Sequence, residues 1–114
     1  MTDTAMEIFN LNDGYAVSAQ IQPDDVAALA DAGFVAVICN RPDGEEAGQP
    51  TAEEVRNACR EAGIAFHHVP VTGGYLTAES VLLHKSIIES ADGPVLGYCR
   101  SGQRSAMIYE SGIS

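Results

Sequence analysis

The segment from Tyr98 to Ser105 reads YCRSGQRS and combines a cysteine with two arginines, two serines and a glycine. It follows a β-prone run and opens a helical one, so Cys99 lies where the N–H groups of a helix N-terminus have no internal partner. These groups, together with Arg100 and Arg104, stabilise a thiolate and lower the cysteine pKa. The segment therefore predicts Cys99 as a nucleophile inside an anion-binding loop.

The neighbours of Cys99 are predicted to complete this site. Arg104 has a planar guanidinium that suits a tetrahedral oxyanion, and the Ser105 hydroxyl could donate to the thiolate. Gly102 lets the backbone turn tightly around a bound group. A strand-end cysteine that only packs is the alternative, but so polar a segment is a poor core. The expected catalytic residues are Cys99, Arg104 and Ser105, and the expected substrate-binding residues are Arg100, Ser101, Gly102 and Gln103.

Short strands and helices alternate along the chain. Strands are predicted at residues 15–20, 34–40, 64–71 and 93–99, the first of them at a sheet edge. Helices are predicted at residues 22–33, 51–63 and 77–91, and a last one starts within the cysteine segment. This alternation predicts one α/β domain over residues 1–114, with a mostly parallel central sheet flanked by helices.

Three predicted loops follow the carboxyl ends of predicted strands, at residues 41–50, 72–76 and 100–104. In parallel α/β sheets, sites form at that edge, so we expect the three loops to lie together there. Cys39 ends one of these strands and is either a small core residue or a thiol that resolves Cys99. Arg41 is expected to hold its loop through ion pairs.

Composition excludes several classes of function. A formal net charge of −10 with six basic residues leaves no basic face for nucleic acid or for an anionic membrane. Three cysteines without paired spacing fit a reducing compartment, and the N-terminal residues lack the features of a secretory signal. We therefore expect a cytoplasmic protein. No metal-ligand spacing and no nucleotide-binding motif occurs, so no cofactor is expected.

The cysteine segment resembles the active loops of two related groups, the cysteine-dependent protein phosphatases and the rhodanese sulfurtransferases. With NRPDGEE, PVTGG and PVLGYCRSGQRSA, the chain closely resembles the bacterial beta-lactamase-hydrolase-like, phosphatase-like domains (the DUF442 group) over residues 15–107. The resemblance implies a dual-specificity-phosphatase-like fold. Members of the family that the chain resembles occur alone or fused to metallo-β-lactamase-like or redox domains. Some of these members are named sulfurtransferases and others phosphatases.

Two departures from the phosphatase pattern affect the expected activity. Only residues 100–103 separate Cys99 from Arg104, one fewer than in the phosphatases, and rhodanese loops are similarly compact. The resemblance to phosphatases also implies an aspartate after the strand at residues 64–71, where this chain has threonine and two glycines. The carboxylates left as candidate general acids are Asp43, Glu45 and Glu46.

Both departures favour sulfur chemistry. We expect a sulfurtransferase in which Cys99 takes a sulfane sulfur from a small anionic donor, such as thiosulfate or glutathione persulfide, and passes it to a thiol acceptor. The alternative is a phosphatase of the tyrosine or dual-specificity type that acts through a phosphocysteine. A second alternative is a non-catalytic module that binds an anion or senses redox state. A homo-oligomer or a redox partner protein is compatible with each.

Overall fold

The fold is built on a five-stranded sheet with the strand order β1-β2-β5-β3-β4. The computed structural model describes residues 7–113, so residues 1–6, on which the expectation about a secretory signal largely depends, lie outside it. Strands β2, β5, β3 and β4 run parallel, and β1 pairs antiparallel with β2. The strands are β1 (Ile8–Asn12), β2 (Tyr15–Ser18), β3 (Ala36–Cys39), β4 (Ala65–His68) and β5 (Val95–Tyr98).

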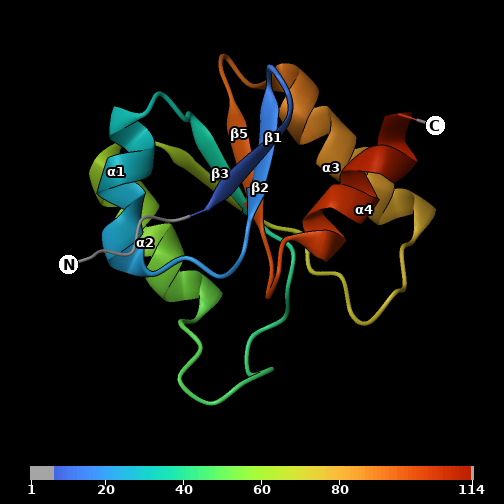
Figure 1. The fold of residues 1–114 in the computed structure, drawn as a ribbon, viewed down its shortest axis with the longest axis horizontal. Coiled ribbons are helices and arrows are strands. Elements are labelled where there is room, and N and C mark those ends of the chain that lie inside the picture. Colours follow the sequence, from blue (N-terminus) through green and yellow to red (C-terminus); the bar gives the residue numbers. More distant parts are fainter. Residues whose placement is uncertain (1–6, 114) are drawn as a thin grey trace.

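Helices cover both faces of this sheet (Figure 1). One face packs against α1 (Val26–Asp31) and α2 (Ala52–Ala62), and the other against α3 (Ala78–Ser90) and α4 (Gln103–Ile113). A short 3₁₀ turn, η1 (Pro23–Asp25), precedes α1. The predicted α/β architecture with a mostly parallel sheet is therefore confirmed. Within residues 7–113, no helix combines the length and the apolar character needed to span a bilayer.

The prediction that residues 15–20 form an edge strand is wrong. β2 is an inner strand between β1 and β5, and all four of its residues are buried. Its alternation of small and large residues suggested one solvated face. Instead, Ala16 belongs to the cluster under α1 and α2, whereas Tyr15 and Val17 belong to the cluster under α3 and α4. Both faces of β2 are covered, so small and large residues alternate between two cores.

The edge is taken by β1, which the sequence analysis did not predict. This strand is mostly exposed, and its residues carry no clear apolar alternation. A usable signal was present, because Asp13-Gly14 between two short runs is a common two-residue hairpin turn. The N–H of Gly14 donates to the Asn12 side chain at 2.7 Å, which closes that turn.

Helix α2 begins where its sequence predicts. The Thr51 hydroxyl accepts from the Glu54 N–H at 3.1 Å, and a Glu54 carboxylate oxygen accepts from the Thr51 N–H at 2.8 Å. This reciprocal pair satisfies two N–H groups that a helix start leaves without internal partners. It fixes the end of the 42–51 loop, which approaches the candidate site from this side.

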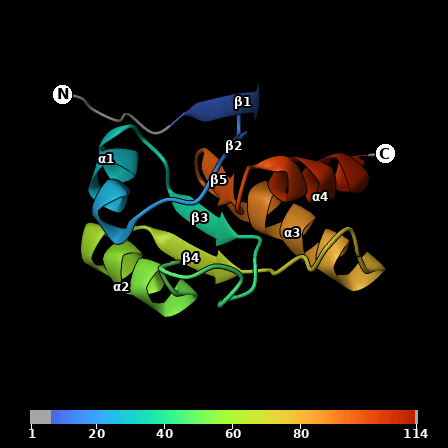
Figure 2. The same cartoon turned by 60° about the horizontal axis from the view of Figure 1, so that its bottom comes forward.

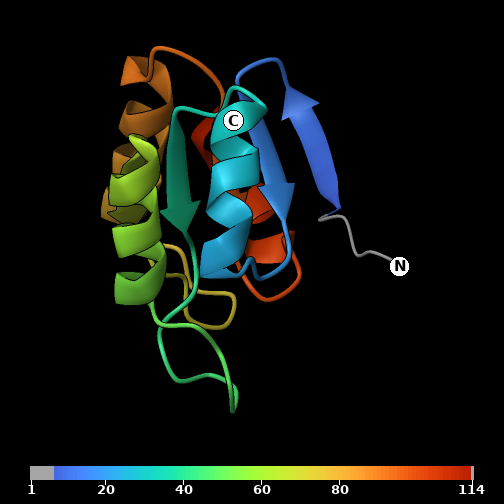
Figure 3. The ribbon, with the colours of Figure 1, turned by 90° about the vertical axis from the view of Figure 1, so that its left-hand side faces the viewer.

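The loops that follow β3, β4 and β5 lie at one end of the sheet (Figure 2). In Figure 3 the 42–51 loop extends furthest beyond the strands at this end. The three loops predicted to share an edge are thus on the same side of the molecule. Because β5 is the central strand, Cys99, which follows it directly, lies in the middle of that end.

Gly97 in β5, two residues before Cys99, packs closely against the side chains of Tyr15 and Asn40. A Cβ at this position would collide with the Tyr15 hydroxyl and approach Tyr15 Cζ to 2.9 Å and Asn40 Oδ1 to 3.2 Å. We predict that Gly97→Ala lowers the free energy of unfolding by about 1–3 kcal/mol, as overpacking typically does. Urea unfolding measures this. Gly74→Ala is the control, because a Cβ there meets nothing within 4 Å. Equal stability of both variants would contradict the prediction.

Candidate active site

Cys99 lies at the turn between β5 and α4 and is fully buried. The turn depends on Gly102, whose φ of 95° is in the left-handed region that favours glycine. A Cβ at Gly102 would also come within 3.4 Å of the Ser18 backbone. The chain therefore folds back tightly after the strand, and its N–H groups surround the cysteine sulfur.

Backbone donors converge on that sulfur. The Gly102 N–H donates to Cys99 Sγ at 3.0 Å. Burial alone would raise the pKa of the Cys99 thiol, but the surrounding N–H groups outweigh burial and hold this pKa below its ordinary value. The backbone N–H groups that lower this pKa are those of Ser105, Ser101, Gly102 and Arg104, and among them the Gly102 N–H has full hydrogen-bond geometry in the described structure. The arrangement favours a thiolate, the form in which cysteine attacks.

Ser105 takes part differently from what the sequence suggested. Its backbone N–H, rather than its hydroxyl, lowers the Cys99 pKa. The Ser105 hydroxyl is buried and has no hydrogen-bond partner among the described residues. The first turn of α4 turns the side chain of Ser105 into the interior, while its N–H, which has no helical partner, faces the sulfur.

Arg104 lies beside Cys99 and is held from two directions. Its guanidinium forms two parallel hydrogen bonds to Glu45, from Nη2 to Oε1 at 2.8 Å and from Nη1 to Oε2 at 2.9 Å. Nη1 also donates to the Val71 carbonyl at 2.7 Å, and Glu45, with a smaller contribution from Cys99, raises the pKa of Arg104. The structure thus brings the predicted nucleophile and the predicted anion ligand together.

The remaining predicted substrate-binding residues lie on the outer side of this loop. Arg100 is 68% exposed, and its Nε lies 3.5 Å from a Glu46 carboxylate oxygen. Ser101 and Gln103 are exposed, and the Gln103 N–H donates to the Ser101 hydroxyl at 3.3 Å. These exposed side chains make no hydrogen bond to the Cys99 sulfur in the described structure.

Each of the three carboxylates considered as a general acid already has a partner. Asp43 accepts from the Ala52 N–H at 2.8 Å, at the start of α2. Hydrogen bonds from Arg104, ahead of those from Arg41, hold the pKa of the Glu45 carboxyl below its ordinary value. Glu46 lies 3.4 Å from Arg41 and 3.5 Å from Arg100. Glu45, the carboxylate bonded to Arg104, is therefore ionised at neutral pH and holds no proton to donate.

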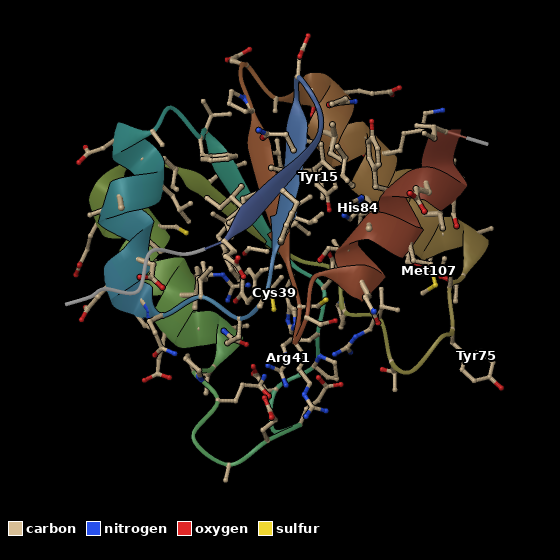
Figure 4. The ribbon with its side chains drawn as sticks, viewed as in Figure 1. Tyr15, Cys39, Arg41, Tyr75, His84 and Met107 are labelled. Carbon is tan, nitrogen blue, oxygen red and sulfur yellow. The ribbon has the colours of Figure 1, made fainter. Side chains whose placement is uncertain are left out.

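Arg41 holds Glu45, the carboxylate that binds Arg104. Its side chain is completely buried, and it lies at the end of the sheet beyond Cys39 in Figure 4. Its Nε donates to Glu45 at 2.9 Å and its Nη1 to Gln20 at 2.8 Å. Its carbonyl oxygen bonds to His68 Nε2 at 2.9 Å. A buried guanidinium needs such partners, since an unpaired buried charge is strongly destabilising.

The buried hydrogen bonds that connect Tyr15 to His84 and to Ser105 were not predicted from the sequence. The Tyr15 hydroxyl donates to the Ser105 carbonyl at 3.1 Å and lies 3.2 Å from His84 Nε2 (Figure 4). Because the hydroxyl hydrogen is directed to Ser105, His84 Nε2 carries the hydrogen of the second bond. The contact links β2 and α3 to the first turn of α4. Its sequence signal was the position of His84 on the apolar stripe of α3 with Val81 and Ile88.

Three other residues, Cys39, Tyr98 and Tyr75, make no hydrogen bond to the Cys99 sulfur in the described structure. Cys39 packs in the cluster under α1 and α2 with Tyr98, and its thiol donates to the Arg41 carbonyl at 3.3 Å. Side chains alternate along a strand, so Cys99 faces the opposite side from Tyr98. Tyr75 is 85% exposed and points away from the sheet in Figure 4. Across residues 7–113, no group of three or more metal-ligating side chains is placed to hold an ion.

Comparison with known proteins identifies the family. The description "Beta-lactamase hydrolase-like protein, phosphatase-like domain" fits residues 7–113, and the chain belongs to this family. It is 36% identical over 104 residues to the beta-lactamase hydrolase-like protein of Xylella fastidiosa strain Temecula1, covering 91% of this chain and 24% of that protein. The chain thus spans about a quarter of the length of the curated relatives it matches.

Solved structures agree with this assignment. A candidate phosphatase from Neisseria meningitidis Z2491 is 35% identical, with a TM-score of 0.81 over 90% of this chain and 72% of that one. Kinase-associated phosphatase, with its catalytic-site cysteine replaced by serine, is 16% identical, with a TM-score of 0.78 over 98% of this chain and 75% of that one. The second likeness shows the fold alone. The expected dual-specificity-phosphatase-like fold is confirmed, and these names fit the phosphatase alternative better than the sulfurtransferase expectation.

The three cysteines are expected to react in different pH ranges. The pKa of Cys99 is lowered, whereas burial raises that of Cys39 and raises that of Cys59 to about 11. We predict that iodoacetamide labels Cys99 fastest at every pH up to 8, with a midpoint below that of an ordinary thiol. Peptide mass spectrometry at several pH values measures each site. Labelling of Cys99 with an ordinary or raised midpoint would contradict the account of the loop.

His84 is expected to make stability depend on pH. Burial lowers its pKa to about 4, below the unfolded value of about 6.5. Its contribution is therefore complete above the unfolded pKa and is lost as the pH falls towards 4. As the pH falls from about 6.5 to 4, the wild type should lose up to about 3 kcal/mol of unfolding free energy because His84 must become protonated. We predict that His84→Gln, which has no group that titrates at this position, does not show this loss. Urea unfolding checks this, and parallel pH curves for the two proteins would count against it.

Proposed function

We propose that this protein is a sulfurtransferase that carries a sulfane sulfur as a persulfide on Cys99. The observation that carries this proposal is the state of the carboxylates beside the loop. Asp43 caps a helix, and Glu45 and Glu46 are paired with arginines. A phosphomonoester leaves as an alkoxide or phenolate and benefits from a proton donor. In sulfur transfer the leaving group is a thiolate or sulfite, which is a stable anion and needs no proton donor.

The compact loop supports the same chemistry. Its N–H groups are already directed at a single sulfur atom, and Gly102 donates at 3.0 Å. The negative charge of a terminal persulfide sulfur would lie next to these donors, as an oxyanion does in acyl transfer. With four residues between Cys99 and Arg104, the cradle is small. It suits one added sulfur better than a phosphoryl group with three oxygens.

The proposed reaction has two displacement steps. The Cys99 thiolate attacks the outer sulfur of a donor R–S–SH, the donor S–S bond breaks, and RS⁻ leaves with the bonding electron pair. Cys99–S–SH remains. An acceptor thiolate R′S⁻ then attacks the outer sulfur, forms R′S–SH and releases the Cys99 thiolate. No net oxidation occurs, and each leaving group is a thiolate of modest basicity.

A phosphatase is the second candidate, and a specific observation favours it. The family is described as phosphatase-like, and the structures that resemble this chain include proteins named phosphatases. In that reaction the Cys99 thiolate attacks phosphorus, the phosphocysteine is hydrolysed by water, and the leaving oxygen takes a proton. The donor would have to be water or a carboxylate that leaves its present partner.

We predict that exposure to glutathione persulfide or thiosulfate adds one sulfur atom to Cys99 and that cyanide removes it. Intact-protein and peptide mass spectrometry measure the gain and its position. Cys99→Ser should lose the added sulfur completely, because serine cannot form a persulfide. Cys39→Ser is the matched control and should keep it, since the Cys39 thiol packs in the cluster under α1 and α2 and donates to the Arg41 carbonyl.

A parallel exposure to a chromogenic phosphomonoester separates the two candidates. Cys99-dependent release of phosphate without any added sulfur would overturn the sulfurtransferase proposal in favour of the phosphatase. Absence of both activities would leave an anion-binding module, the remaining alternative from the sequence.

A further inference from the structure

The guanidinium of Arg104 is largely occupied by the protein itself. Of its five N–H donors, two bind the Glu45 carboxylate in parallel, at 2.8 and 2.9 Å, and a third binds the Val71 carbonyl at 2.7 Å. The parallel pair is the geometry with which arginine binds two oxygens of a phosphate or sulfonate. A tetrahedral oxyanion that sought this pair of donors would therefore have to displace Glu45.

Glu45 is not free to move aside at low cost. Its Oε1 also accepts from Arg41 Nε at 2.9 Å, and Arg41 is completely buried. Gln20 and Glu46 fix the other two nitrogens of Arg41. Removing Glu45 from Arg104 would loosen its ion pair with Arg41, whose side chain is completely buried although that of Glu45 is 25% exposed. Separating such a partly buried pair costs more than separating a fully exposed one. The carboxylate is therefore held in the fork of Arg104 from both sides.

The charge around the cysteine is also balanced before any substrate arrives. Arg41, Arg100 and Arg104 each lie within 4.0 Å of a carboxylate of Glu45 or Glu46. The Cys99 thiolate adds a negative charge, and the whole chain carries a formal charge of −10. A dianion therefore meets a site with no unpaired arginine among these three, whereas a donor with one charge or none is repelled less.

We propose that Glu45 is a specificity-determining residue that keeps tetrahedral dianions out of the fork of Arg104 and so selects organic persulfides as sulfur donors. This inference rests on the proposed function. An organic persulfide brings its outer sulfur to Cys99 without an oxyanion to dock, so the N–H groups of the loop suffice. Thiosulfate, sulfate and phosphomonoesters all present oxygens that need the arginine fork.

Anion binding can be measured without any sulfur transfer. Inorganic sulfate that enters the loop should protect Cys99 from iodoacetamide, a neutral reagent, and the sulfate concentration that halves the labelling rate gives its affinity. We predict that Glu45→Gln binds sulfate about tenfold more tightly than the wild type, which corresponds to about 1.4 kcal/mol. Glutamine retains one oxygen for Arg41 but no longer neutralises Arg104.

Two further variants complete this experiment. Glu53→Gln is the matched control, because it removes the same charge from an exposed pair with Arg56 on α2, and its sulfate affinity should equal that of the wild type. Glu45→Asp keeps the charge but is one methylene too short to hold both arginines. It should also bind sulfate more tightly, which provides a test if Glu45→Gln folds poorly. Equal sulfate affinity in the wild type and a folded Glu45 variant would overturn the proposal.

Donor preference is then measured by the rate of sulfur loading on Cys99. The wild type should load faster from glutathione persulfide than from thiosulfate, and Glu45→Gln should raise the ratio of the thiosulfate rate to the persulfide rate by about tenfold. A wild type that prefers thiosulfate would overturn the choice of donor. If neither donor loads sulfur while the Glu45 variants still bind sulfate more tightly, the proposed function fails and the exclusion of dianions by Glu45 stands.

Discussion

The site depends on one interaction, the convergence of backbone N–H groups on the sulfur of Cys99. Burial of a thiolate is unfavourable, and these donors reverse its effect on the pKa. They reach the sulfur because Gly102 adopts a φ of 95° against the backbone of β2. The loop is held from behind by the Tyr15 hydroxyl, which binds the first turn of α4. The nucleophile is thus prepared by backbone geometry rather than by a neighbouring base.

A second layer of charge surrounds this core and limits what the nucleophile can meet. Buried Arg41 positions Glu45, and Glu45 in turn positions and neutralises Arg104. This chain of contacts connects the 42–51 loop to the cysteine loop across the end of the sheet. It is the arrangement on which the proposed exclusion of dianions rests, since the guanidinium of Arg104 is already paired with Glu45. The family's phosphatase-like fold is thereby compatible with chemistry other than phosphate release.

The sequence predicted the parts that depend on local pattern. The buried strands, the capped start of α2 and the position of Cys99 between strand and helix follow from residue type and spacing. The partners within the site could not be read from it. Ser105 donates through its backbone, and the pairing of Glu45 with Arg104 joins residues 59 positions apart. No role was assigned to His84 from the sequence, although its position on the apolar stripe of α3 indicates burial. β1 was missed because an exposed edge strand has little apolar alternation.

The central claim is that sulfur passes through Cys99 during turnover, and a rapid-quench experiment tests it most directly. The protein is loaded with ³⁵S from a labelled organic persulfide and mixed with an acceptor thiol, and the label on Cys99 is followed in time. The account predicts that label leaves Cys99 at least as fast as steady-state turnover and appears in the acceptor in equal amount. Label that leaves Cys99 more slowly than turnover, or an acceptor labelled at full rate by the Cys99→Ser protein, would contradict it.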